Sequence, residues 1–348
     1  MARTTPRAAP RNHDRDAAPK ADPAQSITDE IIALLEKGTV PWHQPWRSIG
    51  VPRRHEGSPY RGINAFLLGL RAGMAGHGSP YWMTFRQAKE MGAHVRKGEK
   101  SSLVVYYGTA RTKGAEAAEG GGGEGAADGD GEGGGAYRFL KSYRVFNASQ
   151  IDGLEPRFHP APEHEGAARV EPIMRWQRFM EAIGTGGSIS TDFGGDRACF
   201  VPSQGRVHMP EIARFEGAGQ FYSTWWHELT HATKAEGRLD RSFGASRFGN
   251  EAYAKEECVA ALSQCLADQF MGFGTDHIES HAAYIDSWLR VLRGDKRFLF
   301  AAAAHAQRAV DWLVAAAARG GVTLDERDGY GAVADAGGAG SEVQHEAA

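Results

Sequence analysis

The stretch FYSTWWHELTHATKAEGRLD, residues 221 to 240, decides how the C-terminal part of the chain is interpreted. It contains His227-Glu228-Leu229-Thr230-His231, an HExxH motif. On a helix, residues four positions apart project from the same face, so the two imidazoles can bind one metal ion. The intervening Glu228 lies beside them and can accept a proton from a water molecule that the metal activates. The motif therefore predicts a helix that carries a catalytic metal site.

An HExxH motif also arises by chance, and the alternative is that His227 and His231 are ordinary helix residues that hydrogen-bond to their neighbours. The aromatic residues that precede the motif favour the metal site. They predict a buried helix, and buried imidazoles need polar partners. These aromatic residues are Phe221, Tyr222, Trp225 and Trp226.

A catalytic zinc site takes three protein ligands and keeps one open position, so a third ligand must be found. The metzincin motif would place a histidine at position 237, where this chain has Gly237. The candidates are Glu256 and Glu257 on a predicted downstream helix, as in a gluzincin. Small residues at Ala260 and Ala261 allow close helix packing on the side of Glu257. We therefore predict Glu257 as the ligand, with Glu256 as the alternate; the other carboxylate either supports the second histidine or is solvated.

The N-terminal half is strongly basic, although the whole chain has a net charge of −3. From Lys37 to Lys113 there are 13 Lys or Arg residues and three Asp or Glu residues. Aromatic residues interleave with these cations, which suits single-stranded DNA, because bases stack on rings and phosphates pair with cations. The alternative is a solvated basic surface whose aromatic residues form a core. The predicted DNA contacts are Arg53, Arg54, Arg61, Arg96, Lys97 and Lys100, together with Trp42 and Trp46.

Apolar periodicity predicts an α+β chain with two domains. Helices are expected over residues 26–38, with Thr28 as N-cap, and over 63–76, 84–93, 173–184, 219 onward, 250–272, 281–294 and 295–318. Strands are expected over residues 100–110 and 136–151, and as a short pair within 198–210. The short pair precedes the HExxH helix, where an edge strand could bind an extended peptide.

Changes in composition divide the chain into a small N-terminal α+β domain and a mostly helical, zincin-like C-terminal domain. The predicted divisions are a disordered tail at 1–24, an ssDNA-binding domain at 25–155, a linker at 156–172, a metallopeptidase domain at 173–318 and a second disordered tail at 319–348. The acidic, Gly-rich segment 114–135 has no apolar residue except alanine. It cannot order itself by burial, so we predict a flexible insertion in a hairpin.

Cysteine usage and hydropathy indicate the compartment. Three cysteines, Cys199, Cys258 and Cys265, form no CxxC pair and no disulfide framework, which favours a reducing, cytoplasmic location. The N-terminal residues contain no apolar run typical of a secretory signal. Charged residues interrupt the most apolar stretch, residues 298–318, so we expect no membrane span and a soluble monomer.

Several segments in fixed order resemble the ArdC-like antirestriction proteins. They are VPWHQPW (40–46), YRGINAFLL (60–68), SPYWMTFRQAKEMGAHVRKGEKS (79–101), YRVFNASQIDGL (143–154), HELTH (227–231), GRLDR (237–241) and YAKEECVAAL (253–262). The resemblance extends over about residues 27 to 317. It implies an N-terminal domain that binds single-stranded DNA and a C-terminal zincin-like metallopeptidase domain. Such proteins are encoded largely on mobile elements and protect incoming DNA from host restriction.

The resemblance also implies the residues of the metal site, namely His227, Glu228, His231 and one of Glu256 and Glu257. We expect Zn²⁺ there, with Mn²⁺ or another divalent ion as alternatives, and Glu228 as the catalytic base of a peptidase. The rival hypothesis is a non-catalytic ssDNA-binding shield or decoy whose metal is structural. This chain departs from the family pattern in its Gly-rich insertion and at Ala261, where the family usually has an acidic residue.

Overall fold

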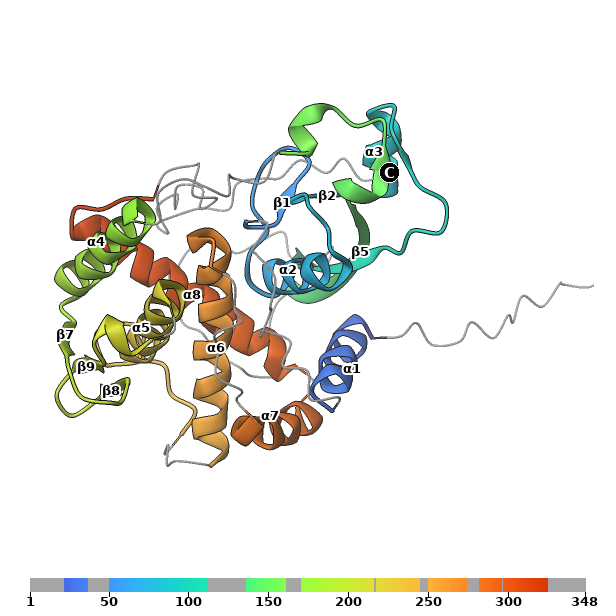
Figure 1. Ribbon diagram of the computed structural model, residues 1–348. Helices are drawn as coiled ribbons and strands as arrows, with labels where there is room; N and C mark the ends of the chain where they lie inside the picture. Colours follow the sequence, from blue (N-terminus) through green and yellow to red (C-terminus); the bar gives the residue numbers. More distant parts are fainter. Residues whose placement is uncertain are drawn as a thin grey trace, which may run out of the picture.

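The computed structural model describes residues 22–36, 50–111, 136–160, 170–215, 217–244, 250–273, 282–295 and 297–324. The N-terminal half contains α1 (Pro23–Glu36), β1 (Arg53–Arg54), α2 (Gly62–Ala75), β2 (Tyr81–Met83), α3 (Phe85–Glu90), β3 (His94–Val95), β4 (Ser102–Arg111), β5 (Ala136–Asn147) and β6 (Ile151–Asp152). The C-terminal half contains α4 (Val170–Gly187), β7 (Ser190–Phe193), β8 (Cys199–Val201), β9 (Arg206–Met209), α5 (Ala218–Ala232), α6 (Glu251–Met271), α7 (Ala282–Gly294) and α8 (Phe298–Arg319). Two parts that mix helices and sheets confirm the predicted α+β class (Figure 1).

The N-terminal half is built on a four-stranded sheet with the order β1-β2-β5-β4. Strands β4 and β5 pair as the antiparallel hairpin that the sequence predicted, with Ser102 opposite Val145. Strand β4 lies at the edge, and Asn64 of α2 covers that edge at Val105. The Asn64 side chain donates to the Val105 carbonyl oxygen at 2.7 Å and accepts from the Val105 N–H at 2.9 Å. Because both outward-facing backbone groups of Val105 are satisfied, no other strand can pair with β4 at this position.

The prediction that Thr28 caps the first helix is wrong. Helix α1 begins at Pro23, and Thr28 lies buried within it. The side chain of Asp22 accepts a hydrogen bond from the Ala24 N–H at 3.0 Å, as expected of a residue that precedes a helix. Pro23 also suits the first turn, where a helix needs no backbone donor, so the helix starts one turn earlier than its apolar stripe suggested.

The C-terminal half combines helices α4 to α8 with a three-stranded sheet of order β7-β9-β8. Strands β8 and β9 are the predicted antiparallel pair. Strand β7, which we did not predict, lies parallel to β9 on its other side, with Thr191 opposite Val207. Strand β8 is thus left at the edge that faces helix α5, and the two elements are in contact.

Helices α4 and α8 pack backbone against backbone, which only glycine permits. A Cβ atom on Gly186 of α4 would lie 1.9 Å from the carbonyl oxygen of Ala316 in α8. A Cβ atom on Gly320, directly after α8, would lie 2.1 Å from the carbonyl oxygen of Ala182 in α4. Helices α5 and α6 pack against this close α4–α8 pair.

The two halves share one hydrophobic cluster, because α2 packs against both α6 and α8 (Figure 1). The Gly62 N–H donates to Gln307 Oε1 of α8 at 2.8 Å, and Gln269 Nε2 of α6 donates to the Ala65 carbonyl oxygen at 3.3 Å. A Cβ atom on Gly69 of α2 would lie 2.4 Å from Gln269 Nε2, so α2 and α6 lie in close contact.

The predicted divisions fall close to element ends. Helix α4 begins at Val170, three residues before the expected domain start, and α8 ends at Arg319. Phe158, at the start of the predicted linker, is buried in a second, smaller core with Met83 and Ile151. The insertion 114–135 lies outside the described residues, as do residues 1–21 and 325–348. Among the described helices, none is long and apolar enough to cross a membrane.

Candidate metal centre

Helix α5 presents the HExxH motif from a buried position. Its preceding aromatic residues pack inward as predicted, and Trp226 is fully buried. The Trp226 indole N–H donates to Ser263 Oγ of α6 at 3.0 Å, and Ser263 Oγ also lies 2.9 Å from Thr230 Oγ1. These polar contacts fix the rotation of α5 against α6. As a result, His227 and His231 face the helix that carries the two candidate carboxylates.

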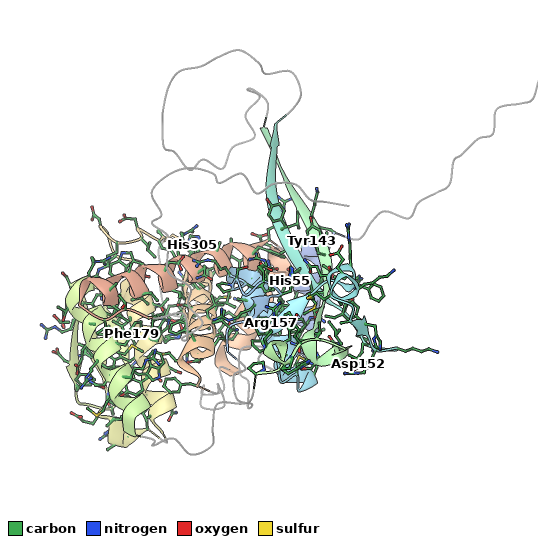
Figure 2. The ribbon with its side chains drawn as sticks, turned by 90° about the horizontal axis from the view of Figure 1, so that it is seen from above. His55, Tyr143, Asp152, Arg157, Phe179 and His305 are labelled. Atoms are coloured by element: carbon green, nitrogen blue, oxygen red, sulfur yellow. The ribbon has the colours of Figure 1, made fainter. Side chains whose placement is uncertain are left out.

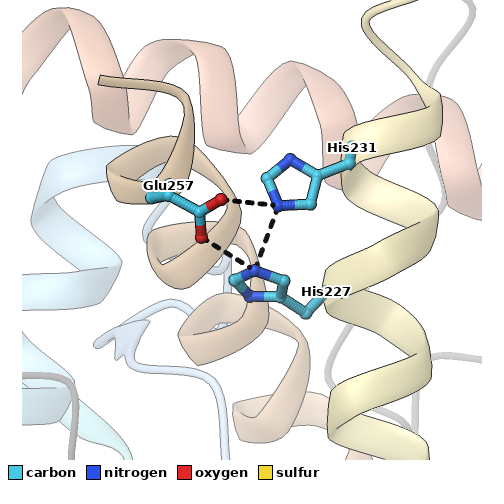
Figure 3. Close-up of side chains that lie close together, drawn as sticks. All are labelled: His227, His231 and Glu257. Carbon is cyan, nitrogen blue, oxygen red and sulfur yellow. Dashed lines mark hydrogen bonds and ion pairs between the residues drawn. The ribbon is translucent and has the colours of Figure 1, made fainter. Parts of the chain in front are cut away.

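The side chains of His227, His231 and Glu257 converge on one point (Figure 3). The two Nε2 atoms are 3.1 Å apart, and each lies 3.4 Å from a different oxygen of Glu257. One ligand atom from each residue lies within 4.8 Å of the others. Two imidazoles and a carboxylate are a donor set that binds divalent zinc in catalytic sites. The residues present therefore fit a divalent metal ion.

The other ring nitrogens of the histidines are held by residues of α6. His227 Nδ1 lies 3.1 Å from Gln264 Oε1, and His231 Nδ1 lies 3.2 Å from Glu256 Oε1. Hydrogen bonds of this kind orient an imidazole and place its lone pair on the opposite nitrogen. Both Nε2 atoms are thereby directed toward Glu257. The structure thus places Glu257 among the histidine Nε2 atoms and Glu256 behind one of them, while their roles as ligand and support stay predictions.

Arg241 completes the environment of Glu256, and the sequence did not reveal it as part of the site. Its Nε and Nη2 atoms donate to the two oxygens of Glu256 at 2.9 Å and 2.7 Å. It also donates to the Thr230 carbonyl oxygen at 3.1 Å, so it ties Glu256 to helix α5. The available signal was its place in the GRLDR segment soon after the motif, where a buried arginine needs an acidic partner.

The carboxylates of this cluster are held in their charged forms. Burial raises the pKa of Glu256, but hydrogen bonds from Arg241 and His231 outweigh that effect and lower it to about 2. Burial opposes ionisation of Glu257 as well, yet the charge of His231 and hydrogen bonds from both histidines hold its pKa well below the usual range. Burial alone would lower the pKa of His231, but the surrounding carboxylates raise it. A metal ion at this position would therefore displace a proton from His231.

Glu228, the predicted base, is anchored to the neighbouring sheet. Its Oε2 atom accepts a hydrogen bond from the Phe200 N–H of β8 at 2.8 Å. Phe200 is opposite Val207 in the β8–β9 pair. Its N–H points away from β9, because Cys199 and Val201 make the ladder bonds on that side. The edge of β8 thus orients the carboxylate beside the two histidines.

Several of the predicted DNA contacts are engaged within the protein. Arg61 forms an ion pair with Asp311 of α8. Arg96 forms ion pairs with Glu99 at 2.8 Å and with Asp152 at 3.3 Å.

Two of the other predicted contacts, Arg53 and Arg54, form strand β1. Arg53 donates to the Gly57 carbonyl oxygen at 2.9 Å. Arg54 donates to Ser58 Oγ at 3.0 Å and lies over the Tyr60 ring. Lys97 and Lys100 are exposed in the turn before β4. Trp42 and Trp46 lie outside the described residues. The roles of these eight residues in DNA binding stay predictions.

Comparison with known proteins agrees with both halves of the architecture. Residues 21–146 match the family model of the N-terminal domain of the anti-restriction factor ArdC, and residues 176–305 match that of a zincin-like metallopeptidase. The metal-free crystal structure of the antirestriction ArdC protein from plasmid R388 is 40% identical, with a TM-score of 0.67, and the match covers 85% of this chain and 98% of that one. The chain belongs to the ArdC family.

Other ArdC relatives extend this comparison. The Mn(II)-bound structure of the R388 protein is 39% identical, with a TM-score of 0.65 and the same coverage. A protein of Sinorhizobium fredii, y4eC, is 36% identical over 305 residues, which are 86% of this chain and 94% of that protein. The DNA primase TraC of Escherichia coli is 33% identical over 300 residues, 84% of this chain but 27% of TraC. The zincin-like domain and the Mn(II)-bound relative both indicate a divalent metal for this family member.

Proposed function

We propose that this ArdC-family chain is an antirestriction protein of a mobile element that binds single-stranded DNA and cleaves a protein substrate with a metal-dependent peptidase site. Three observations support the proposal: family membership, the similarity to the antirestriction ArdC protein of R388, and the similarity to TraC. We propose that the protein acts as a monomer in the cytoplasm. The proposed N-terminal domain spans residues 25–155 and the peptidase domain spans 173–318.

The observation that carries the peptidase proposal is the joint position of His227, His231, Glu257 and Glu228. The first three converge from two helices, and Glu228 lies next to them with one oxygen fixed by the Phe200 N–H. A structural metal site is usually closed by four protein ligands, whereas a catalytic one has three. The cluster found among the described residues has three members, which favours catalysis.

Each residue has a defined part in the proposed reaction. The two histidines and Glu257 would hold the metal, and Gln264 and Glu256 keep the imidazoles in the orientation needed to bind it. A bound divalent metal would supply Lewis acidity that polarises a peptide carbonyl and acidifies water. Glu228 accepts the proton of the attacking water and then carries it to the leaving amine. The Phe200 N–H holds the charged Glu228 carboxylate in position between these transfers.

A Glu228→Gln variant tests the peptidase proposal. The substitution removes the base, keeps the shape of the side chain and spares both histidines. We expect protein cleavage, assayed with and without single-stranded DNA, to fall by at least about 100-fold, because general base catalysis contributes about 10²–10⁴-fold. Metal content should remain equal to that of the wild type.

A restriction assay in cells separates the proposal from the rival shield hypothesis. If the Glu228→Gln variant protects incoming DNA as well as the wild type, protection depends on occupancy of the DNA and not on hydrolysis. If protection falls together with cleavage, the peptidase is the mechanism.

We propose Zn²⁺ as the native metal. Mn²⁺ is the alternative, because one structure of the R388 relative is bound to Mn(II). Elemental analysis of protein purified without added metal tests this choice. A His227→Ala/His231→Ala double variant serves as the control and should retain neither ion. Retention of one metal equivalent by that variant would place the metal elsewhere in the chain.

A further inference from the structure

We propose that the β4–β5 hairpin carries a binding surface for single-stranded nucleic acid, formed by Tyr106, Tyr143 and Lys141. The inference rests on the proposed DNA-binding function and assigns that binding to a surface other than the contacts predicted from the sequence. None of these three residues was among the contacts predicted from the sequence. We call the three residues the hairpin surface.

The two tyrosine rings are exposed although both strands continue into the core. Tyr106 is 54% exposed and Tyr143 is 47% exposed, whereas Val104 and Val145 nearby are buried. Figure 2 shows the hairpin projecting beyond the helical body, with Tyr143 on its described part. Large exposed rings on a projecting element mark an interaction surface, because burial would otherwise be favourable.

Strand register places both rings on the same face. Tyr106 is opposite Lys141, and Val104 is opposite Tyr143. Side chains alternate along a strand, so Tyr106, Lys141 and Tyr143 share one face of the hairpin. The two tyrosines are diagonal neighbours, at a Cα separation of about 7–8 Å. Adjacent exposed rings of this kind can stack on successive unpaired bases.

Charge favours an anionic partner. The sequences of β4 and β5, SLVVYYGTAR and AYRFLKSYRVFN, contain four Lys or Arg residues and no Asp or Glu. Arg144, which is next to Tyr143 but projects from the other face of the hairpin, donates to a neutral partner, Ser101 Oγ, at 3.2 Å. By contrast, Arg61 and Arg96 already form ion pairs with carboxylates of the protein. Phosphate groups can therefore approach the hairpin without displacing an internal salt bridge of Arg144.

The backbone of β4 beside Tyr106 disfavours a peptide partner there. An extended peptide on this side would bind by pairing with the edge of β4, since β4 is the terminal strand of its sheet. Asn64 already occupies the outward N–H and C=O of Val105, directly before Tyr106. The accessible chemistry is then the side-chain face, which offers rings and cations. Single-stranded nucleic acid uses both.

Fluorescence anisotropy with labelled oligo(dT) and the full chain tests the inference. We expect the Tyr106→Ala/Tyr143→Ala variant to bind at least about tenfold more weakly than wild type, because each base–aromatic stack contributes substantially to affinity. The Tyr106→Phe/Tyr143→Phe variant keeps both rings and should bind like wild type. Phe85→Ala is the matched control, since Phe85 is an exposed aromatic residue of α3 in the same half, with 58% exposure. It should also bind like wild type.

A second variant keeps the test informative if the double alanine variant does not fold. Lys141→Gln should lower the slope of log affinity against log salt by about 0.7, the value expected for one phosphate contact on a single strand. Oligo(U) should bind comparably to oligo(dT), because rings stack on either base, and a duplex of the same sequence should bind more weakly. Equal or tighter duplex binding would overturn the inference.

The outcomes separate this inference from the proposed function. If wild type binds oligo(dT) and both hairpin variants bind equally well with an unchanged salt slope, the hairpin surface is wrong and DNA binding itself stands. If wild type does not bind oligo(dT) at all, both the surface and the DNA-binding part of the proposed function are overturned.

Discussion

Adjacent residues in a helix can face different partners, and Glu256 and Glu257 show the consequence. One carboxylate lies between the two histidine Nε2 atoms, and the other lies between Arg241 and the back of His231. Consecutive helix positions are rotated by about 100°, so two neighbouring side chains cannot occupy the same site. Substitutions at these two positions should therefore have different effects.

Glu257→Gln should abolish tight metal binding. The change removes the negative charge that lies 3.4 Å from both Nε2 atoms. We expect metal affinity to fall by more than about 100-fold, beyond the range of about 10–100-fold typical of residues that only orient a ligand. Isothermal titration calorimetry with Zn²⁺ measures the effect. An affinity close to that of wild type would show that Glu257 is not a ligand.

Glu256→Gln should mainly lower stability. The Arg241 side chain is 1% exposed and would lose its only carboxylate partner among the described residues. Breaking one side of a buried ion pair costs about 3–5 kcal/mol, because the remaining charge stays buried. Urea unfolding of metal-free protein measures this loss. Unchanged stability, or a loss of metal affinity as large as that of Glu257→Gln, would contradict the assignment.

Asp268 should make stability depend on pH. It is buried in α6, where burial raises its pKa well above 3.8, against a smaller opposing effect of its hydrogen bond with Ser223. A raised folded pKa means that the folded state holds the proton more tightly. Its contribution is therefore complete below about pH 4 and is lost as pH rises toward the folded pKa.

Asp268→Asn removes this dependence because the amide stays neutral. The variant should match wild type near pH 4 and be more stable than wild type at pH 7, because the wild-type carboxyl must bear its raised pKa there. Urea unfolding at both pH values provides the comparison. A stability difference that is the same at both values would contradict the prediction.

At the residue scale, the sequence predicted which helix face carries the HExxH side chains but not which residues contact them. The HExxH spacing predicted that two imidazoles share a face, and their Nε2 atoms are 3.1 Å apart. Gln264 and Arg241 could not be found in this way, because their positions depend on how α5 and α6 pack and on the path of the connecting chain. The ion pairs of Arg61 and Arg96 could not be predicted either, because their partners are distant in the sequence. Arg61 pairs with Asp311 on α8, and Arg96 pairs with Asp152 on β6.

At the scale of elements, long periodic segments were predictable and short polar ones were not. Helices α2, α5, α6 and α8 and the β4–β5 hairpin lie where apolar patterns placed them. Strand β7, with the sequence STDF, has too little apolar content to stand out, and it exists because β9 offers it a parallel partner. The start of α1 was missed because Asp22 and Pro23 begin the helix ahead of its apolar stripe.

The α4–α8 contact gives a prediction at this scale. Gly186→Ala would place a Cβ atom 1.9 Å from the Ala316 carbonyl oxygen, so the helices must separate. Overpacking of this kind costs about 1–3 kcal/mol, and a backbone atom cannot move aside as a side chain can. Chemical denaturation measures the loss. Gly78→Ala is the control, because no atom lies within 4 Å of its added Cβ, and it should change stability by less than about 0.5 kcal/mol.

At the scale of the whole molecule, the two halves should unfold together. Phe66 and Leu70 of α2 belong to the same hydrophobic cluster as Leu266 of α6. A metal bound at the α5–α6 site stabilises any segment that opens only by global unfolding. We expect Zn²⁺ at about 100 times its dissociation constant to slow amide hydrogen exchange in α2 by about 100-fold. Slower exchange in α5 and α6 with no change in α2 would show that the halves unfold independently.

The close contact of α2 with α6 also limits how such proteins can evolve by recombination. Gly69 faces Gln269 without room for another side chain, and α6 carries Glu257 about 18 Å further along the same rod. A recombination event that replaced only one half would bring together two surfaces that had not evolved to pack against each other. The matches to y4eC, to TraC and to the R388 protein each cover at least 84% of this chain. The shared core therefore favours inheritance of the N-terminal half and the C-terminal half as a single block.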